Sequence, residues 1–382
     1  MTFFTPTREE ALARIASVNP AEYARTRNAL NGAVTQLSPY ITHGFVNLPE
    51  VLEGVRSQHT VNSQDKFLFE LGWREYYRHV WQHRGDGIFE SLHEGVLPDS
   101  AYADQIPADI LRACTGIAAI DMAVKTLYGT GYLHNHARMW LASYMVHLRK
   151  VHWRVGADWL YGHLLDGDLA SNHLSWQWVA GTGSNKPYLF NAENVARFAP
   201  VDWHSAGTPI DTSYEDLDQI ARQRLPVAAS AISSSNLVVE PSLISSPPTS
   251  LNVGTPNTNV AKGRDVWLVH SWSLGDLPAD LPKDSLVIGV FVSEFHRAWP
   301  WNEKRWLFVQ SRMAELASEC WYGDRLSIEL ALQGAKRLGG MSEAHIAPWL
   351  PSAGQYIPSP ALFANVDRRC DSFSKWWRLV SQ

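Results

Sequence analysis

Apolar residues recur at helical spacing from residue 7 to about residue 198, and this spacing predicts a block made almost entirely of α-helices. The pattern is clearest in residues 67–76 and 119–127. Thr7 with Glu10 is typical of a helix N-cap followed by a capping-box acid, and Asp65 precedes another helical run. A trailing helix is expected within residues 201–224.

The composition changes in residues 225–264, which are rich in Ser, Pro, Asn and Thr. Such a segment cannot bury enough apolar surface to fold alone. We therefore expect a linker or a mobile loop there.

The periodicity changes again after residue 264. The short, nearly continuous apolar runs typical of buried parallel strands are DVWLVHS and DSLVIGVFVSE. We expect an amphipathic helix in NEKRWLFVQSRMAELASECW, a third strand in LSIELAL and a helix in QGAKRLGG. Alternation of strand and helix predicts a small α/β domain, Rossmann-like with a parallel sheet, over residues 265–382.

Composition identifies a folded globular chain, with 45% hydrophobic and 19% charged residues. Net charge is −5, and residues 1–200 hold 17 Lys and Arg against 19 Asp and Glu, which argues mildly against extensive nucleic-acid binding. A local basic patch remains open, formed by Arg74, Arg78, Arg84, Arg149, Lys150 and Arg154.

Three widely spaced cysteines exclude a disulfide framework and an all-Cys metal site, and no metal is expected. The first ten residues contain acids and no basic, apolar leader, so we expect no signal peptide. No apolar run approaches the 18 residues that a membrane span needs, and the expected location is the cytoplasm.

The densest cluster of chemistry lies in residues 164–191, LLDGDLASNHLSWQWVAGTGSNKPYLFN. Two Asp, one Asn and two Trp fall between Asp166 and Trp178. The chain also has 17 Trp. Most of these are expected in the core, but indole rings also stack on flat ligands and carry electrons.

This cluster and four earlier motifs, in the same order, resemble the FAD-binding region of DNA photolyases and cryptochromes. The earlier motifs are ARTRNALNGAVTQLSPYITHG (24–44), ELGWREYY (70–77), TGIAAIDMAVKTLYGTGYLHNHARM (115–139) and VHWRVG (151–156). The resemblance implies FAD bound in a bent form by the helical domain, 1–224. It leaves the antenna chromophore undetermined.

The resemblance also implies which residues hold the cofactor. Pyrophosphate contacts are expected from Thr35, Gln36, Leu37 and Ser38, because a helix N-terminus supplies N–H donors. Arg138 and Asp166 would pair beside the flavin ring, Asp168 would accept from N3–H or ribose, and Asn172 would face N5. The remaining cofactor residues are Tyr23 and Arg74.

Electron transfer to the flavin is expected through Trp176 and Trp153, the first two members of the family's chain of tryptophans. At the expected place of the third, residues 99–109 offer only Tyr102. Tyr102 substitutes for it, another Trp does, or the chain ends at two.

The substrate positions match enzymes that repair cyclobutane pyrimidine dimers. These residues are Glu70, Trp73, Asn135, Met139 and Trp178. The first function expected is a deoxyribodipyrimidine photolyase acting on UV-damaged DNA by extruding its target base. The alternative is a cryptochrome-like light sensor with a protein signalling partner. A weaker third reading is a dark redox flavoprotein.

The order of the domains is reversed relative to the family, in which the α/β domain comes first. DVWLVHSWSLGDL resembles the family's opening strand, and the C-terminal residues resemble its connector. We therefore expect a circular permutation, with domains at 1–224 and 265–382 joined by a linker at 225–264.

Overall fold

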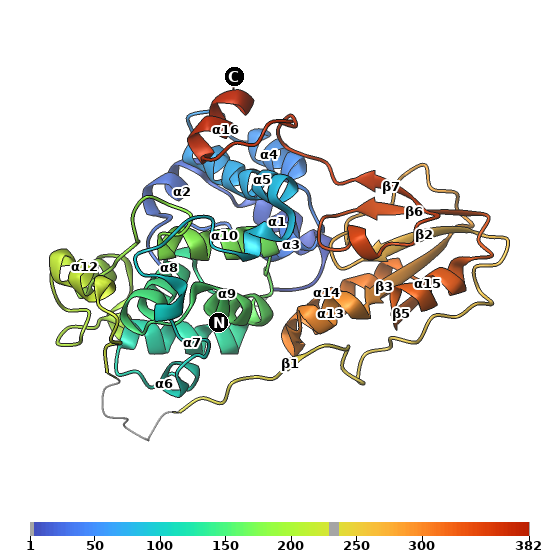
Figure 1. Ribbon diagram of the computed structural model, residues 1–382. Helices are drawn as coiled ribbons and strands as arrows, with labels where there is room; N and C mark the ends of the chain where they lie inside the picture. Colours follow the sequence, from blue (N-terminus) through green and yellow to red (C-terminus); the bar gives the residue numbers. More distant parts are fainter. Residues whose placement is uncertain (1–3, 229–236, 382) are drawn as a thin grey trace.

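Two parts lie side by side in the computed structural model, which describes residues 4–228 and 237–381 (Figure 1). The first is helical, and the second contains a five-stranded parallel sheet. This agrees with the sequence prediction of a helical domain and a small α/β domain with a parallel sheet.

The helical part contains α1 to α12 and short 3₁₀ or π-helical turns. The α-helices are α1 (Arg8–Ala16), α2 (Pro20–Thr26), α3 (Ser38–Thr42), α4 (Leu48–Arg56), α5 (Lys66–Arg84), α6 (Ala108–Leu111), α7 (Ala118–Thr130), α8 (Asn135–Ser143), α9 (Trp153–His163), α10 (Leu169–Ala180), α11 (Ala192–Phe198) and α12 (Tyr214–Arg222). The turns are Gly85–Phe89, Asp99–Ala101, Tyr144–Leu148 and Val201–Trp203.

Both predicted helix starts are found, but only one of the two predicted residues caps its helix through its side chain. Thr7 caps α1 by accepting from the backbone N–H of Glu10 at 3.2 Å, which confirms the expected cap. Asp65 does precede α5, but its carboxylate accepts from the backbone N–H of Asn62 at 2.6 Å and does not cap the helix.

The sheet of the α/β part has the order β5-β3-β2-β6-β7. Its topological switch point therefore lies between β2 and β6, the place where open α/β sheets form a crevice at their carboxyl ends. The elements are β2 (Asp265–His270), β3 (Leu286–Val292), α13 (Ser293–Ala298), β4 (Trp301–Asn302), α14 (Glu303–Leu316), β5 (Glu319–Gly323), α15 (Arg325–Leu332), β6 (Arg337–Ser342), a 3₁₀ turn (Ala347–Trp349) and β7 (Gln355–Pro358).

Two predicted elements of this part are wrong. The run LSIELAL is helix α15, because Asp324 caps it by accepting from Ser327 N at 2.7 Å and its buried residues fall at helical spacing. The run QGAKRLGG ends in strand β6, not in a helix. The third strand is β5, which the prediction had included in the preceding helix.

The segment after the helical part is held in place over its described residues. Leu243–Ile244 (β1) pairs antiparallel with β4. The Ser245 carbonyl accepts from the Tyr322 hydroxyl at 2.9 Å, and Gly254 bonds with the backbone of Cys320 at 2.8 Å. Residues 238 and 240 contact the helical part, and the segment from β1 onward contacts the α/β part. Residues 229–236 of the predicted linker lie outside the described chain.

The last residues return to the helical part. The sequence suggested an α/β domain reaching residue 382, but beyond β7 the chain leaves the sheet and ends in α16 (Phe373–Val380), which packs on α5 (Figure 1). The apolar face of α16, with Phe373 and Trp376 buried, covers aromatic side chains of α5. Within the described residues, no helix is both long and apolar enough to cross a membrane.

Candidate flavin site and aromatic pocket

A cavity of about 150 Å³, the cofactor cavity, lies between the start of α3, helices α5, α8 and α10, and the loop that follows α9. Its polar wall is made mostly of residues expected from the sequence. The lining residues are Ser38, Arg74, Asn135, Arg138, Met139, Ala142, Leu160, Leu164, Asp166, Asp168, Ser171, Asn172, Ser175, Trp176 and Val179.

Arg138 and Asp166 form a two-bond ion pair in this wall. One guanidinium nitrogen lies 2.9 and 2.7 Å from the two carboxylate oxygens of Asp166. The Arg138 Nε–H donates to the Leu133 carbonyl at 2.7 Å, which fixes the guanidinium plane. A two-bond pair of this kind holds a positive charge at a defined place beside the cavity.

Asp168 has one oxygen that the protein does not satisfy. It caps α10, with Oδ1 accepting from Ser171 N at 2.8 Å, but its buried Oδ2 has no hydrogen-bond partner among the described residues. Arg74 and Arg78 stand at 3.5 and 3.8 Å from that oxygen. Burial alone would raise the pKa of Asp168, but Arg74, together with its other cationic neighbours, holds it well below its usual range.

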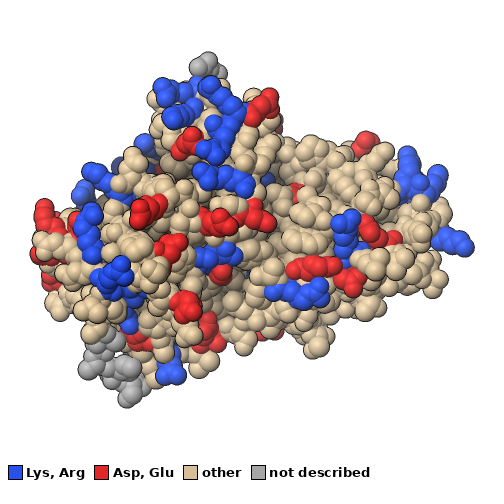
Figure 2. Space-filling model, viewed as in Figure 1, with Lys and Arg blue, Asp and Glu red and all other residues tan. Residues whose placement is uncertain are grey.

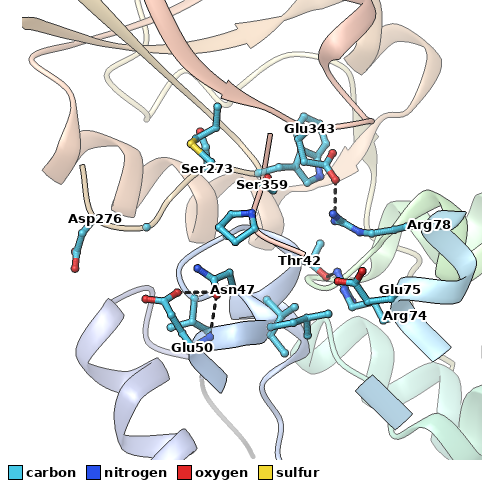
Figure 3. A pocket seen from close by; sticks show the side chains of 18 of the residues that line it. Thr42, Asn47, Glu50, Arg74, Glu75, Arg78, Ser273, Asp276, Glu343 and Ser359 are labelled. Atoms are coloured by element: carbon cyan, nitrogen blue, oxygen red, sulfur yellow. Dashed lines mark hydrogen bonds and ion pairs between the residues drawn. The ribbon is translucent and has the colours of Figure 1, made fainter. Parts of the chain in front are cut away.

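Residues of the α/β part reach the same carboxylate. His345, which follows β6, accepts from Leu169 N at 3.1 Å through Nε2 and donates to Glu343 from Nδ1 at 2.6 Å. Glu343 in turn pairs with Arg78 at 2.7 Å (Figure 3). Although burial opposes it, His345 and Arg78 lower the pKa of Glu343 to about 2. A buried chain of charges thus joins the switch point of the sheet to Asp168.

Asn172 and Ser171 complete the polar side of the cavity. The Asn172 side-chain amide donates to the Ala157 carbonyl at 2.8 Å, which fixes the orientation of the amide. The buried hydroxyl of Ser171 has no hydrogen-bond partner within the described chain. Buried polar atoms are normally paired, so the Ser171 hydroxyl and the free oxygen of Asp168 are places where a bound polar ligand would find a partner.

The expected pyrophosphate residues are not all at the cavity. Only Ser38 of residues 35–38 is among its lining residues. Thr35 Oγ1 accepts from the backbone N–H of Leu37 at 3.3 Å, and Leu37 is buried. The Gln36 side chain accepts from Arg14 at 2.9 Å.

Tyr23 also lies away from the cavity lining, edge-on to Phe67 at 5.8 Å between ring centroids. Burial, then Glu70, raises the pKa of its hydroxyl. In this structure Tyr23 is therefore a neutral phenol beside Phe67.

The expected substrate residues are divided between two places. Asn135 and Met139 line the cofactor cavity, whereas Trp73 and Trp178 line a separate cavity of about 210 Å³, the aromatic pocket. Glu70 pairs with Arg27 at 3.3 Å. The other residues of the aromatic pocket are Tyr76, Tyr77, Val80, Leu92, Leu174, Gly183, Ser372, Phe373 and Ser374.

One face of Trp73 is covered by the protein itself. Phe373 of α16 stacks on it with ring centroids 4.1 Å apart and planes 11° apart. Trp178, in contrast, is 38% exposed at the other wall of the pocket. Trp73 therefore offers a ligand at most its second face.

Of the expected electron-transfer residues, Trp153 and Tyr102 belong to one series of neighbouring aromatic rings. Trp176 and Trp153 are both buried, and Gly156 allows the Trp176 ring to lie close against α9, since a Cβ there would meet the ring at 2.3 Å. His152 lies between Trp153 and Tyr102, with ring centroids 5.7 and 6.2 Å away. The histidine is an additional aromatic group that the sequence interpretation had not named.

Some residues of these sites were missed. Arg78 stands one helical turn after Arg74, a spacing that could have identified it. Arg27, Glu343, His345 and Phe373 reach the sites from other segments, and no local pattern marks them.

A further cleft of about 260 Å³, the sheet-edge cleft, lies between the carboxyl ends of β2 and β6 and the helical part (Figure 3). Several of its charged side chains pair with one another. Arg8 contacts Glu50 at 2.6 Å and Asp276 at 2.7 Å. Trp272 and His345, stacked at 4.8 Å, fill the deeper part of the switch point.

Comparison with known proteins agrees with the position of the cofactor cavity. Residues 67–208, which contain almost all of its lining, match the family described as the FAD binding domain of DNA photolyase. The donors and acceptors present fit FAD, because the free oxygen of Asp168 requires a donor of the kind that a flavin ring N–H provides.

The relatives are photolyases and cryptochromes. The chain is 33% identical to deoxyribodipyrimidine photo-lyase of Streptomyces griseus over 166 residues, which is 43% of this chain and 36% of that protein. It is 29% identical to cryptochrome DASH of Idiomarina loihiensis over 215 residues, 54% of this chain and 48% of that protein. The chain thus spans less than half the length of these relatives.

Among solved structures, the Synechocystis sp. PCC6803 cryptochrome is 26% identical with a TM-score of 0.45, over 50% of this chain and 43% of that chain.

Proposed function

We propose that this chain, whose helical part is related to the FAD-binding domain of DNA photolyases, repairs cyclobutane pyrimidine dimers in UV-damaged DNA under blue light. The observation that carries the proposal is the cofactor cavity, where the Arg138–Asp166 pair adjoins a carboxylate oxygen of Asp168 that has cationic neighbours but no hydrogen-bond partner among the described residues. Reduced FAD bound there would supply the photoexcited electron that splits a dimer and is then returned.

The chain's own residues would hold and tune the cofactor. Arg138, fixed by Asp166, favours negative charge on the ring, and Asp168 accepts a hydrogen bond from it. Asn172, held by the Ala157 carbonyl, presents its amide to the ring. Ser38 and Arg74 are the cavity residues suited to the pyrophosphate. Thr35, Gln36, Leu37 and Tyr23, which do not line the cavity here, would have to move towards the cofactor to contact it.

The substrate would be held at the aromatic pocket and the adjoining rim of the cofactor cavity. Trp178 offers an exposed stacking face, and Trp73 is held rigid by Phe373. Glu70, oriented by Arg27, accepts from the base edge, while Asn135 and Met139 contact it from α8. Base stacking on an aromatic wall contributes roughly 1–3 kcal/mol per base.

Electrons for reduction of the flavin would pass through Trp176 and Trp153. We propose that Tyr102 ends the series, with His152 between Trp153 and Tyr102, since the ring centroids of these three residues follow one another at 5.7 and 6.2 Å. Replacement of Tyr102 by Phe should slow photoreduction of the flavin and leave flavin content unchanged.

The domain order supports a permuted layout, with a helical domain at 1–224, a linker at 225–264 and an α/β domain at 265–382. In support of this layout, the connecting segment packs on the surface of the α/β part through the pairing of β1 with β4, and surface segments tolerate such rearrangements of the chain.

A second function, that of a light sensor with a protein partner, is favoured by one observation. Phe373 covers one face of Trp73 and so withholds that face from a stacking substrate. A sensor would respond to light with a change of conformation near α16 and would leave dimers intact.

The test is an anaerobic repair assay with purified protein, reduced flavin and an oligonucleotide containing one thymine dimer. We expect light-dependent recovery of undamaged thymine, none in the dark, and a loss of at least tenfold in Trp178→Ala with its flavin content unchanged. Dimers that persist under light, with flavin bound and reduced, would refute repair and favour the sensor.

A further inference from the structure

The segment that follows β7, residues 362–381 and here called the C-terminal strap, runs along α5 (Figure 1). Hydrogen bonds join the two over successive turns of the helix. They are Leu362 N–H to Glu75 at 3.3 Å, His83 to the Val366 carbonyl at 3.1 Å, Cys370 N–H to His79 at 3.1 Å and the Tyr76 hydroxyl to the Cys370 carbonyl at 3.3 Å.

Aromatic packing fixes the end of the strap. Phe373 is 4% exposed and stacks on Trp73, and Phe69 packs edge-on against it at 4.6 Å. Gly72 permits this approach, since a Cβ there would lie 2.4 Å from the Trp377 ring. With one face of α16 buried in this way, the opposite face points to solvent.

The solvent face of the strap is basic. Arg368, Arg369, Lys375 and Arg378 are all exposed, against the two acids Asp367 and Asp371. Arg369 lies 2.9 Å from Asp371. Figure 2 shows Lys and Arg side chains gathered around α16 at the top of the view. Residues 1–200, with 17 basic and 19 acidic residues, have no such excess.

This basic face adjoins the aromatic pocket. Ser372, Phe373 and Ser374 of the strap line the pocket together with Trp73 and Trp178. Lys375 therefore directly follows a pocket residue, and Arg378 lies one helical turn further on. Aromatic walls beside a row of cations are the combination that binds a nucleic-acid strand, through stacking and through phosphate neutralisation.

We propose that the C-terminal strap is a binding surface for the phosphate backbone of DNA, with Lys375 and Arg378 neutralising phosphates that flank a base at the aromatic pocket. The proposal rests on the proposed function. The strap lies beside the helical part only in the folded structure. Its basic residues therefore do not enter the charge count of residues 1–200.

The test is Lys375→Gln with Arg378→Gln, measured by fluorescence anisotropy on a 20-base-pair duplex with and without one thymine dimer across a series of salt concentrations. The matched control is Lys262→Gln with Lys336→Gln, which removes two exposed lysines at the amino-terminal ends of β2 and β6. Flavin content and thermal midpoint of all three proteins serve to show that the fold is kept.

We expect the strap variant to lose at least tenfold in affinity for both duplexes, and its salt slope to fall by roughly 1.8, the value for two phosphate contacts on duplex DNA. The control should bind like the parent. A strap variant with the parent's affinity and slope would overturn the proposal. A parent that binds DNA without repairing it would refute only the proposed function, whereas a parent that binds no DNA would refute both.

Discussion

The cofactor cavity and the sheet-edge cleft are both charged hollows, lined by Arg74 and by residues of both charge signs, yet they differ in how their polar groups are satisfied. In the cofactor cavity, Asp168 Oδ2 and the Ser171 hydroxyl have no hydrogen-bond partner among the described residues. In the cleft, Glu343 Oε1 and Trp272 Nε1 also lack a hydrogen-bond partner within the described chain. The ion pairs there are closer, however: Arg78 lies 2.7 Å from Glu343 Oε1, and Arg8 lies 2.6 and 2.7 Å from Glu50 and Asp276. Arg74 and Arg78 stand 3.5 and 3.8 Å from Asp168 Oδ2 in the cofactor cavity.

This difference distinguishes a ligand-binding site from an interface, here called the joint, whose ion pairs hold two parts of the protein together. A buried polar atom without a partner costs free energy until something binds it. Charges that already pair across two parts of the chain hold those parts together, and adding a ligand would require breaking them. Substitutions in the cofactor cavity and at the cleft test this distinction.

Replacement of Asp168 by Asn should have the largest effect. It removes the acceptor that we assign to FAD and leaves Arg74 and Arg78 without their shared counter-ion, and breaking a buried pair in this way costs about 3–5 kcal/mol. We expect flavin content, measured by absorbance, to fall at least tenfold. Asp218→Asn, at an exposed pair on α12, is the control. Full flavin content in Asp168→Asn would contradict the assignment.

His270, beside the cleft at the end of β2, should make stability depend on pH. Its Nε2–H donates to the Met341 carbonyl at 3.0 Å, and burial lowers its pKa from 6.5 to about 4. As pH falls, the His270 side chain therefore takes up a proton at a higher pH in the unfolded chain than in the folded chain. The free energy of unfolding decreases as pH falls from 6.5 to about 4, by about 3 kcal/mol in total.

The measurement is urea unfolding of the parent and His270→Asn at pH 7, 6 and 5. The parent should lose stability faster than the variant by up to about 1.4 kcal/mol per pH unit. Parallel pH profiles would show that His270 is not the group responsible.

Glu343→Gln should weaken the joint and leave the cofactor in place. We expect the free energy of unfolding at pH 7 to fall by less than the roughly 3–5 kcal/mol lost when a buried pair is broken, because Arg78 loses its closer partner but keeps Asp168 at 3.8 Å. The parent's advantage should vanish as pH falls from 4.5 towards 2, since Glu343 has a lowered pKa of about 2 and its contribution exists only while it is charged. Loss of flavin at pH 7 would place Glu343 in the cofactor site.

Asp276→Asn should have the smallest effect. Its side chain is 64% exposed and pairs with Arg8 and Arg312. Exposed pairs contribute less than about 1 kcal/mol, so the thermal midpoint should barely change. A loss comparable with that in Glu343→Gln would mean that the rim of the cleft contributes to the joint.

One wall of the cofactor cavity could be located from the sequence because its residues are close along the chain. Asp166, Asp168, Asn172 and Trp176 follow one another within a loop and a single helix, and the Arg138–Asp166 pair is found as the resemblance implied. The helical class and the first strands were equally predictable, since periodicity is a local property.

The other elements and site residues could not be predicted from the sequence, because they depend on contacts between segments that are far apart along the chain. Residues 325–332 are apolar enough for a strand, and only the Asp324 cap and the packing of Ile328 make them a helix. Glycines at 339 and 340 suggested no strand, although β6 needs small residues, since a Cβ at Gly340 would lie 2.9 Å from the Leu268 carbonyl. The contacts of His345 with Leu169 and of Phe373 with Trp73 join residues far apart in sequence.

The most direct test of the account is to identify the flavin released from purified protein by heat, using chromatography against FAD and FMN, in the parent and in Arg138→Gln. The account predicts FAD at close to one equivalent per chain in the parent and a marked loss in Arg138→Gln, which lacks the guanidinium that pairs with Asp166. A parent that retains no FAD, even after incubation with an excess of it, would contradict the claim that this cavity is a flavin site.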